Sequence, residues 1–311
     1  MIDDVKEKAA SELASALNVG SLVPAIMFWM GGLLSWATHV GVERVLAAVD
    51  AIDATGTATV VAMGAVTLLV LVSTAGVMGL LRYPLLRLAE GYWPFPFSWL
   101  RHRRVARLNA RFEREAEELA MLEADFRARI LRGPRLARYG RLTFLHAQLP
   151  VDPGLRMPTA VGNAIRAAEE HPFQHYGLEA VTIWPRLWLV LPEPTRQEVD
   201  VARSRLDRRA EVLGWGVCFT AFGALAWWAI PVGLVVAVVG YAGAKQEART
   251  YADMLRSCFD LHRFELYRAL CWPLPTTQEE EWEAGERLTS HLMRNGSRPD
   301  FEHPVTSAST R

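Results

Sequence analysis

Apolar residues in this chain are gathered into three long tracts. Val19 to Val42, Ala54 to Leu81 and Val212 to Ala244 contain no Asp, Glu, Lys or Arg. A helix of about 20 apolar residues is enough to cross the hydrocarbon of a bilayer, whereas the core of a soluble domain seldom uses charge-free runs of this length. The pattern predicts an all-α fold, that of a polytopic helical membrane protein.

The third tract is longer than a single span requires. Its 33 residues would form one helix about 50 Å long, while the hydrocarbon layer is about 30 Å thick. Pro231, near the middle of the tract, offers a break. Two short spans, Val212 to Ile230 and Pro231 to Ala244, would return the chain to the side that it left, whereas one kinked helix would export everything from Lys245 onward. We favour the hairpin and leave the single kinked helix open.

Charge is balanced over the whole chain but unevenly placed along it. Residues 82–209 hold 22 Arg against 15 acidic residues, whereas residues 39–53 hold one Arg and three acidic residues. Cytoplasmic flanks of membrane spans carry the Lys and Arg excess. The sequence therefore predicts four transmembrane helices in the cell (inner or plasma) membrane, with both termini cytoplasmic and long cytoplasmic helical extensions.

This topology divides the chain into six segments. They are an N-terminal amphipathic helix (1–18), transmembrane helices 1 and 2 (19–81), a cytoplasmic helical region (82–211), a transmembrane helical hairpin (212–244), a cytoplasmic helical extension (245–294) and a flexible tail (295–311).

Local signals place helices in the cytoplasmic segments. Apolar side chains at steps of three and four predict one long helix from Val105 to Arg132. Thr159 is expected to cap a helix that runs through Glu170, and Thr195 with Glu198 has the spacing of a capping box.

Aromatic and basic residues cluster soon after the second tract. Tryptophan and tyrosine concentrate at membrane interfaces, and arginines close to the inner surface attract anionic lipid headgroups. We therefore expect one group of residues to contact the cytoplasmic face of the lipid bilayer: Tyr92, Trp93, Phe95, Trp99, Arg101, Arg103 and Arg104.

Small residues in the second and third tracts are typical of closely packed membrane helices, although glycine is also simply frequent in spans. They favour a homo-oligomer. The expected packing positions are Gly64, Gly76, Gly79, Gly216, Gly223 and Gly240. The hydroxyl groups of Thr67, Ser73 and Thr74 are candidates for the lining of a pore.

Motifs for catalysis and cofactor binding are missing from the sequence, which contains no phosphate-binding loop, GxSxG, HExxH or paired CxxC. His171 and His175 have the spacing of zinc ligands on a helix, but Pro172 disfavours a regular helix there and no third ligand is evident. His262 beside Glu265 is a pair that charged helix faces produce routinely. We therefore predict no cofactor, metal or nucleic-acid partner, and an enzyme is disfavoured without being excluded.

Three blocks of the sequence carry a resemblance. GNAIRAAEE (Gly162 to Glu170), YGLEAVTIWPRLWLVLP (Tyr176 to Pro192) and FDLHRFELYRALCWPLP (Phe259 to Pro275) resemble blocks shared by a family of uncharacterised actinobacterial multi-span membrane proteins. The resemblance implies that the cytoplasmic segments and the spans form one unit. It implies no activity and no catalytic or binding residue.

Two functions fit these features. The charge-free tracts contain no ionisable carboxylate or amine, which argues against an ion-coupled transporter. We favour a membrane-anchored helical interaction or sensor protein that self-associates and whose cytoplasmic helices bind a soluble protein partner. The alternative is a homo-oligomeric ion channel or pore with a cytoplasmic helical domain.

Overall fold

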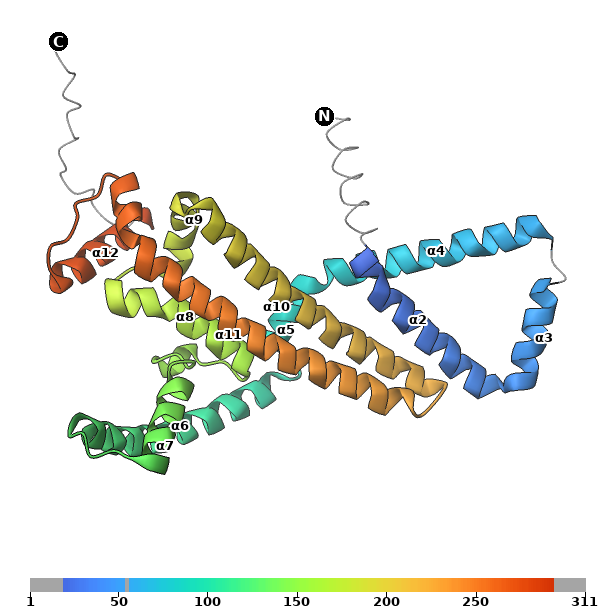
Figure 1. Ribbon diagram of the computed structural model, residues 1–311, viewed down its shortest axis with the longest axis horizontal. Coiled ribbons are helices and arrows are strands. Elements are labelled where there is room, and N and C mark those ends of the chain that lie inside the picture. The colour runs from blue at the N-terminus through green and yellow to red at the C-terminus, as the bar shows by residue number, and fades with distance from the viewer. Residues whose placement is uncertain (1–18, 54–55, 294–311) are drawn as a thin grey trace, which may run out of the picture. The chain divides into compact units, whose positions relative to one another are not determined.

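The computed structural model describes residues 19–53 and 56–293, and every regular element within those ranges is a helix (Figure 1). The predicted all-α fold is confirmed. The predicted amphipathic helix over residues 1–18 and the predicted tail over 295–311 lie outside the described residues. The chain divides into two compact units: unit 1 takes residues 19–88 and 207–244 of the described chain, and unit 2 takes residues 89–206 and 245–293.

Unit 1 consists of long apolar helices. It contains α2 (Val19–Val40), α3 (Val42–Asp53), α4 (Thr57–Leu80), most of α5 (Arg82–Glu90), the end of α10 (Glu193–Phe219), the short 3₁₀ helix η2 (Thr220–Ala224) and the beginning of α11 (Ala229–Ala269). Among the described residues, three helices are long and apolar enough to cross a membrane: α2 (over Leu22–Val40), α4 and α11.

Helices α2 and α4 pack against each other in opposite directions. Ala25 of α2 packs with Met78 of α4 and Trp215 of α10 in a buried apolar cluster. One turn further along α2, Trp29 Nε1 donates a hydrogen bond to Thr74 Oγ1 at 3.1 Å. Gly41 separates α2 from α3 with a φ of +87°, a left-handed conformation that glycine adopts readily.

The third charge-free tract forms a tight hairpin whose turn lies earlier than the sequence predicted. Helix α10 ends at Phe219 and α11 begins at Ala229, so the reversal occupies residues 220–228. Pro231 lies within the first turn of α11, where a missing backbone N–H breaks no helical hydrogen bond. Pro231 thus lies at the start of the second arm, as predicted, but the first arm, predicted to run to Ile230, is wrong in extent because its α-helix ends at Phe219.

Unit 2 is a bundle of shorter helices. It contains α6 (Ser98–Arg127), α7 (Gly133–His146), η1 (Pro153–Leu155), α8 (Ala160–Tyr176), α9 (Ala180–Val190), the beginning of α10, the remainder of α11 and α12 (Gln278–Leu292). Helices α6 and α7 lie side by side (Figure 1), joined by a cluster of buried leucines, Leu122, Leu131 and Leu142.

The helix caps and helix ends predicted in unit 2 agree with the structure only in part. Thr159 is the N-cap of α8 and its side chain accepts a hydrogen bond from Gly162 N, as predicted. The long helix predicted to end at Arg132 ends at Arg127. Thr195 is not a cap, because α10 already begins at Glu193 and takes Thr195 into its first turn.

Helix α12 closes against α8 through two glycines. A Cβ atom on Gly285 would lie 1.8 Å from the carbonyl oxygen of Tyr176, and one on Gly177 would lie 2.2 Å from that of Trp282. Thr289 of α12 donates a hydrogen bond to Gly177 O and accepts one from Glu179 N, both at 3.1 Å. The backbones are therefore in direct contact, and only glycine fits at these positions.

Candidate functional site

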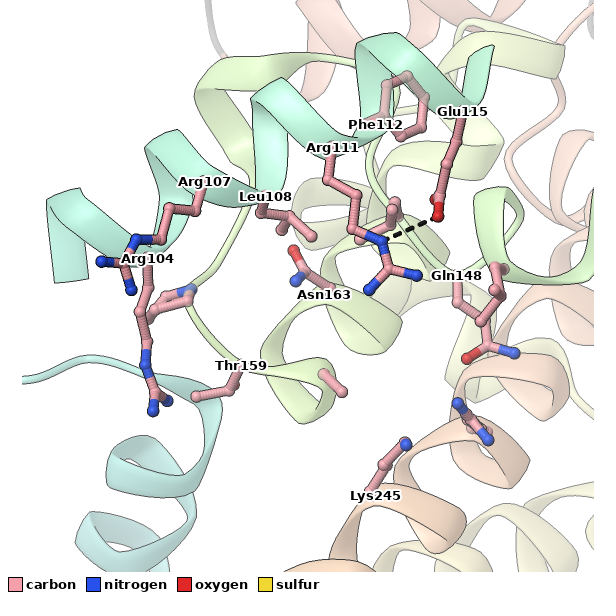
Figure 2. A pocket seen from close by; sticks show the side chains of 15 residues that line it. Arg104, Arg107, Leu108, Arg111, Phe112, Glu115, Gln148, Thr159, Asn163 and Lys245 are labelled. Carbon is pink, nitrogen blue, oxygen red and sulfur yellow. Dashed lines mark hydrogen bonds and ion pairs between the residues drawn. The ribbon is translucent and has the colours of Figure 1, made fainter. Parts of the chain in front are cut away.

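Unit 2 contains a pocket of about 430 Å³ lined mainly by basic and apolar side chains. We call it the basic pocket. Figure 2 shows α6 along one side and Lys245 of α11 facing it across the opening. Its charged lining consists of five basic residues and one carboxylate: Arg104, Arg107, Arg111, Lys245, Arg249 and Glu115.

Helix geometry gathers three of these cations on one edge. Arg104, Arg107 and Arg111 follow each other at steps of three and four along α6, so their side chains share a face. Arg111 Nε donates to Glu115 Oε1 at 2.8 Å (dashed in Figure 2), which neutralises the single carboxylate. The remaining four cations have no carboxylate of the pocket left to pair with.

The four cations that do not pair with Glu115 form two groups: two lie over aromatic rings, and two have no partner among residues 19–53 and 56–293. Arg104 lies over the ring of Trp93, with 5.4 Å from Cζ to the ring centre, and Arg249 lies over that of Phe144 at 5.6 Å. Neither Arg107 nor Lys245 makes a hydrogen bond or an ion pair with any described residue. Both charges remain available to a ligand.

A buried arginine fixes the wall of the pocket. Arg156 is only 4% exposed. Its guanidinium donates to the carbonyls of Pro150 and Val151 and to Asn109 Oδ1. It also covers the ring of Phe112 at 3.8 Å from the ring centre. The loop after α7 is thereby tied to α6.

The imidazole of His146 stacks on the same Phe112 ring, with 4.3 Å between the ring centres. Burial lowers the pKa of His146, and the Glu115 carboxylate, 3.9 Å from Nε2, opposes that shift only in part. The Nε2 atom is buried without a hydrogen-bond partner among the described residues. A neutral His146 therefore suits this packing better than a charged one.

The polar side chains at the base of the pocket are already occupied. Asn163 accepts a hydrogen bond from Met157 N at 2.7 Å and donates to Met157 O at 2.8 Å. Thr159 Oγ1 donates to Glu90 O at 2.7 Å. A ligand would thus meet the cations and the apolar side chains rather than these two groups.

The arrangement suits the binding of an anion. Guanidinium groups match the oxygens of phosphate in a bidentate geometry, and an ammonium adds a compact point charge. Leu108, Leu145 and Leu149 add an apolar surface beside the cations.

The residues predicted to contact the membrane surface differ in exposure: some side chains are exposed and others are half-buried. Phe95 and Trp99 are 89% and 59% exposed, as an interfacial contact requires. Tyr92 and Trp93 are half-buried, and Arg166 donates a hydrogen bond to the Tyr92 hydroxyl. Among the predicted arginines, Arg103 and Arg104 are exposed and Arg101 is half-buried, and Arg104 alone lines the basic pocket.

The six glycines predicted to pack fall into two groups. A Cβ atom on Gly216 would lie 2.4 Å from Ala237 N, and one on Gly240 would lie 2.4 Å from Leu213 N, so both glycines bring the arms of the hairpin into backbone contact. Gly223 meets the side chain of Ile230 across the turn. The remaining three have no described neighbour within 4 Å of the Cβ position: Gly64, Gly76 and Gly79.

The hydroxyl groups proposed to line a pore lie on α4. Thr67 donates to Met63 O and Thr74 to Val70 O, each to the carbonyl four residues earlier in its own helix. Ser73 is exposed. The hydroxyl hydrogens of both threonines are thus used within the helix.

The two histidines with zinc spacing lie in a regular helix, contrary to the expectation from Pro172. Helix α8 continues through Pro172 to Tyr176 and holds the rings of His171 and His175 4.3 Å apart. His171 Nε2 lies 3.0 Å from Asp260 Oδ1, to which the Tyr176 hydroxyl donates at 2.8 Å.

Burial lowers the pKa of His171 and raises that of Tyr176 to about 12. Within the described part of the chain, no three His, Cys, Asp or Glu side chains are grouped so that they could hold a metal ion.

Sequence reasoning missed the basic pocket as a site. It used Lys245 only to mark the end of the third tract, although the steps of three and four from Arg104 to Arg111 are visible in the sequence. What no sequence pattern shows is that α11 brings Lys245 and Arg249 to the same place.

Comparison with known proteins yields no match: no family model, curated protein or solved structure is significantly similar to the chain. The resemblance to an actinobacterial membrane family therefore stays a prediction.

Proposed function

We propose that this chain is a multi-pass protein of the cell membrane that acts as a membrane-anchored helical sensor, with unit 2 on the cytoplasmic side as the part that recognises a ligand. In this topology α2, α4 and the two arms of the hairpin lie in the bilayer and both termini are cytoplasmic. Arginine-rich flanks support this orientation. The four membrane segments carry no Asp, Glu, Lys or Arg, which favours an anchor over an ion-coupled transporter.

The basic pocket is the observation that carries the proposal. Five cations around one carboxylate give the pocket an excess of positive charge, which attracts an anion. Arginine binds phosphate in a bidentate geometry, and the apolar side chains beside the cations suit an amphiphile. We therefore propose a phosphate-bearing ligand, with anionic phospholipid at the inner leaflet as its source.

A binding measurement tests this function. The protein would be placed in nanodiscs of neutral lipid and titrated with a short-chain phosphatidylglycerol, and in a parallel arm with glycerol 3-phosphate. We expect saturable binding of the lipid. Binding of glycerol 3-phosphate with equal affinity would point to a soluble phosphate ester as the ligand instead.

Two variants separate the pocket from general surface charge. Arg107→Gln combined with Lys245→Gln removes two cations that hold nothing else in place. Each basic residue near an anionic ligand contributes about 1 kcal/mol, so the pair should weaken binding about 30-fold. Arg114→Gln is the matched control, since Arg114 lies on α6, is exposed and does not line the pocket. Equal affinity in the two proteins would refute the pocket as the site.

The homo-oligomeric pore is a second candidate that one observation favours. Every residue from Gly56 to Val70 of α4 is exposed, so a second copy of the chain has a complete helix surface to pack on. Self-association through the exposed Gly64 is common to both functions. Conductance of reconstituted protein in planar bilayers, abolished by Thr67→Leu, would support the pore, and its absence under varied voltage and pH would count against it.

A further inference from the structure

The hairpin formed by residues 212–244 does not reach as far as the two helices beside it. Its arms pair in a fixed register within unit 1: Leu213 lies against Gly240, Gly216 against Ala237, and Gly223 against Ile230. The last charged residue before the hairpin is Glu211, and the first after it is Lys245, so both ends of the charge-free region lie at the same level of the pair.

The length of the arms limits the depth of the hairpin. The charge-free part of α11 runs from Ala229 to Ala244. At about 1.5 Å per residue it covers about 24 Å, which falls short of a hydrocarbon layer about 30 Å thick. The other arm is no longer, since its regular helix ends at Phe219 and only η2 continues it.

The neighbouring helices allow the length of the hairpin to be compared with theirs from a shared starting point. Ala25, Met78 and Trp215 share one cluster and so mark one level on α2, α4 and α10. From that level α4 extends back to Thr57, about 30 Å, whereas the hairpin extends only about 15 Å to its turn.

Contacts at the turn agree with this estimate. The position of a Cβ on Gly32 of α2 lies 2.5 Å from the Phe222 ring, and one on Gly31 lies 2.3 Å from that of Phe219. Helix α2 then continues from Gly32 to Val40, about 12 Å further.

The last four residues of the turn are apolar. Turns that face water are rich in Gly, Asn, Asp and Ser, but this one reads Leu225, Ala226, Trp227, Trp228. Part of its backbone is paired locally, since Leu225 N and Ala226 N donate to Phe222 O and Ala229 N donates to Ala226 O. No described residue accepts a hydrogen bond from Trp227 N or Trp228 N. Hydrocarbon supplies no partner for an unpaired backbone N–H group, so the tip of the hairpin must lie close to the headgroups.

We propose that this hairpin is re-entrant: it enters the bilayer from the cytoplasmic side and turns back beneath the outer headgroups without emerging. Trp227, which is 79% exposed in the chain, then lies near the outer interface, where tryptophan is favoured. The inference rests on the proposed topology, in which α2 and α4 cross the membrane completely.

Single cysteines in the full-length protein test the depth, after replacement of Cys218, Cys258 and Cys271. Trp227→Cys reports the turn, Glu43→Cys reports the outside in the proposed topology, and Gln246→Cys reports the cytoplasm. A membrane-impermeant maleimide applied to intact cells should label Glu43→Cys alone, and applied to inverted vesicles should label Gln246→Cys alone.

A nitroxide spin label on Trp227→Cys in liposomes supplies a positive signal. We expect collisions with oxygen to exceed those with a water-soluble nickel chelate, as in hydrocarbon, and the reverse for Glu43→Cys. Labelling of Trp227→Cys from outside together with strong nickel collisions would overturn the inference and indicate two complete short spans. Failure of Glu43→Cys to label from outside would instead overturn the topology on which the inference rests.

Discussion

Replacing the glycines between the arms of the hairpin should separate two helices that touch through their backbones. An alanine Cβ at Gly216 would stand 2.4 Å from Ala237 N and 2.8 Å from its Cα, and one at Gly240 would stand 2.4 Å from Leu213 N and 2.8 Å from its Cα. Contact between heavy atoms is comfortable at about 3.5 Å or more. Each methyl group therefore forces the arms apart by about 1 Å.

This displacement has a calculable effect on stability. A gap of about 1 Å forfeits a quarter to a half of the dispersion attraction along the seam, and overpacking of this kind costs about 1–3 kcal/mol. We expect Gly216→Ala to lower the free energy of unfolding by about 2 kcal/mol. The double variant with Gly240→Ala should lose less than twice that, because one separation relieves both clashes.

Reversible unfolding in bicelles measures these differences. Gly64→Ala is the matched control, since it makes the same chemical change in an apolar helix at a position with no described neighbour within 4 Å of the Cβ. It corrects for the gain in helix propensity on replacing glycine, up to about 1 kcal/mol. If Gly216→Ala proved as stable as Gly64→Ala, the arms could not be in backbone contact. The pairing of Gly216 with Ala237 and of Gly240 with Leu213 would then be wrong.

Three further outcomes follow from unit 2. Leu142→Ala, at a fully buried position between α6 and α7, should cost about 3 kcal/mol by leaving a cavity, measured by chemical denaturation. Burial lowers the folded-state pKa of His146 and His171, so the unfolded chain binds protons first on acidification. The melting temperature should therefore fall as the pH drops below about 6.5, and His146→Phe should make this fall less steep. A melting temperature that rose toward acid pH would contradict this. Gly285→Ala should detach α12 and lower the melting temperature by several degrees, whereas Gly140→Ala, with open space around its Cβ, should leave it unchanged or raise it.

Much of the fold was predictable because hydrophobic pattern and helix capping are local. The charge-free tracts predicted α2 and α4 closely, and Thr159 was identified as a cap from its own neighbours. Errors arose where a local rule allowed two outcomes. The apolar residues 220–228 could continue the first arm or form the turn, and Thr195 has the spacing of a cap even though α10 begins two residues before it.

The basic pocket could be predicted only in part. Arg104 was singled out, and its repeat along α6 was visible, but Lys245 is far away in sequence and reaches the pocket through the packing of unit 2. The same limit applies to the glycines: sequence composition treats Gly64 and Gly216 alike, although only Gly216 touches another helix of the chain. Tertiary contact, which composition does not encode, separates them.

The guanidinium of Arg156 has a thermodynamic consequence for whatever enters the basic pocket. By holding the carbonyls of Pro150 and Val151 together with Asn109, it fastens a proline-containing loop that contributes Gln148, Leu149 and Pro158 to the rim. A rim that is ordered before the ligand arrives loses little conformational freedom on association. Calorimetry should accordingly measure a smaller unfavourable entropy of binding than that of a loop that must fold around its ligand.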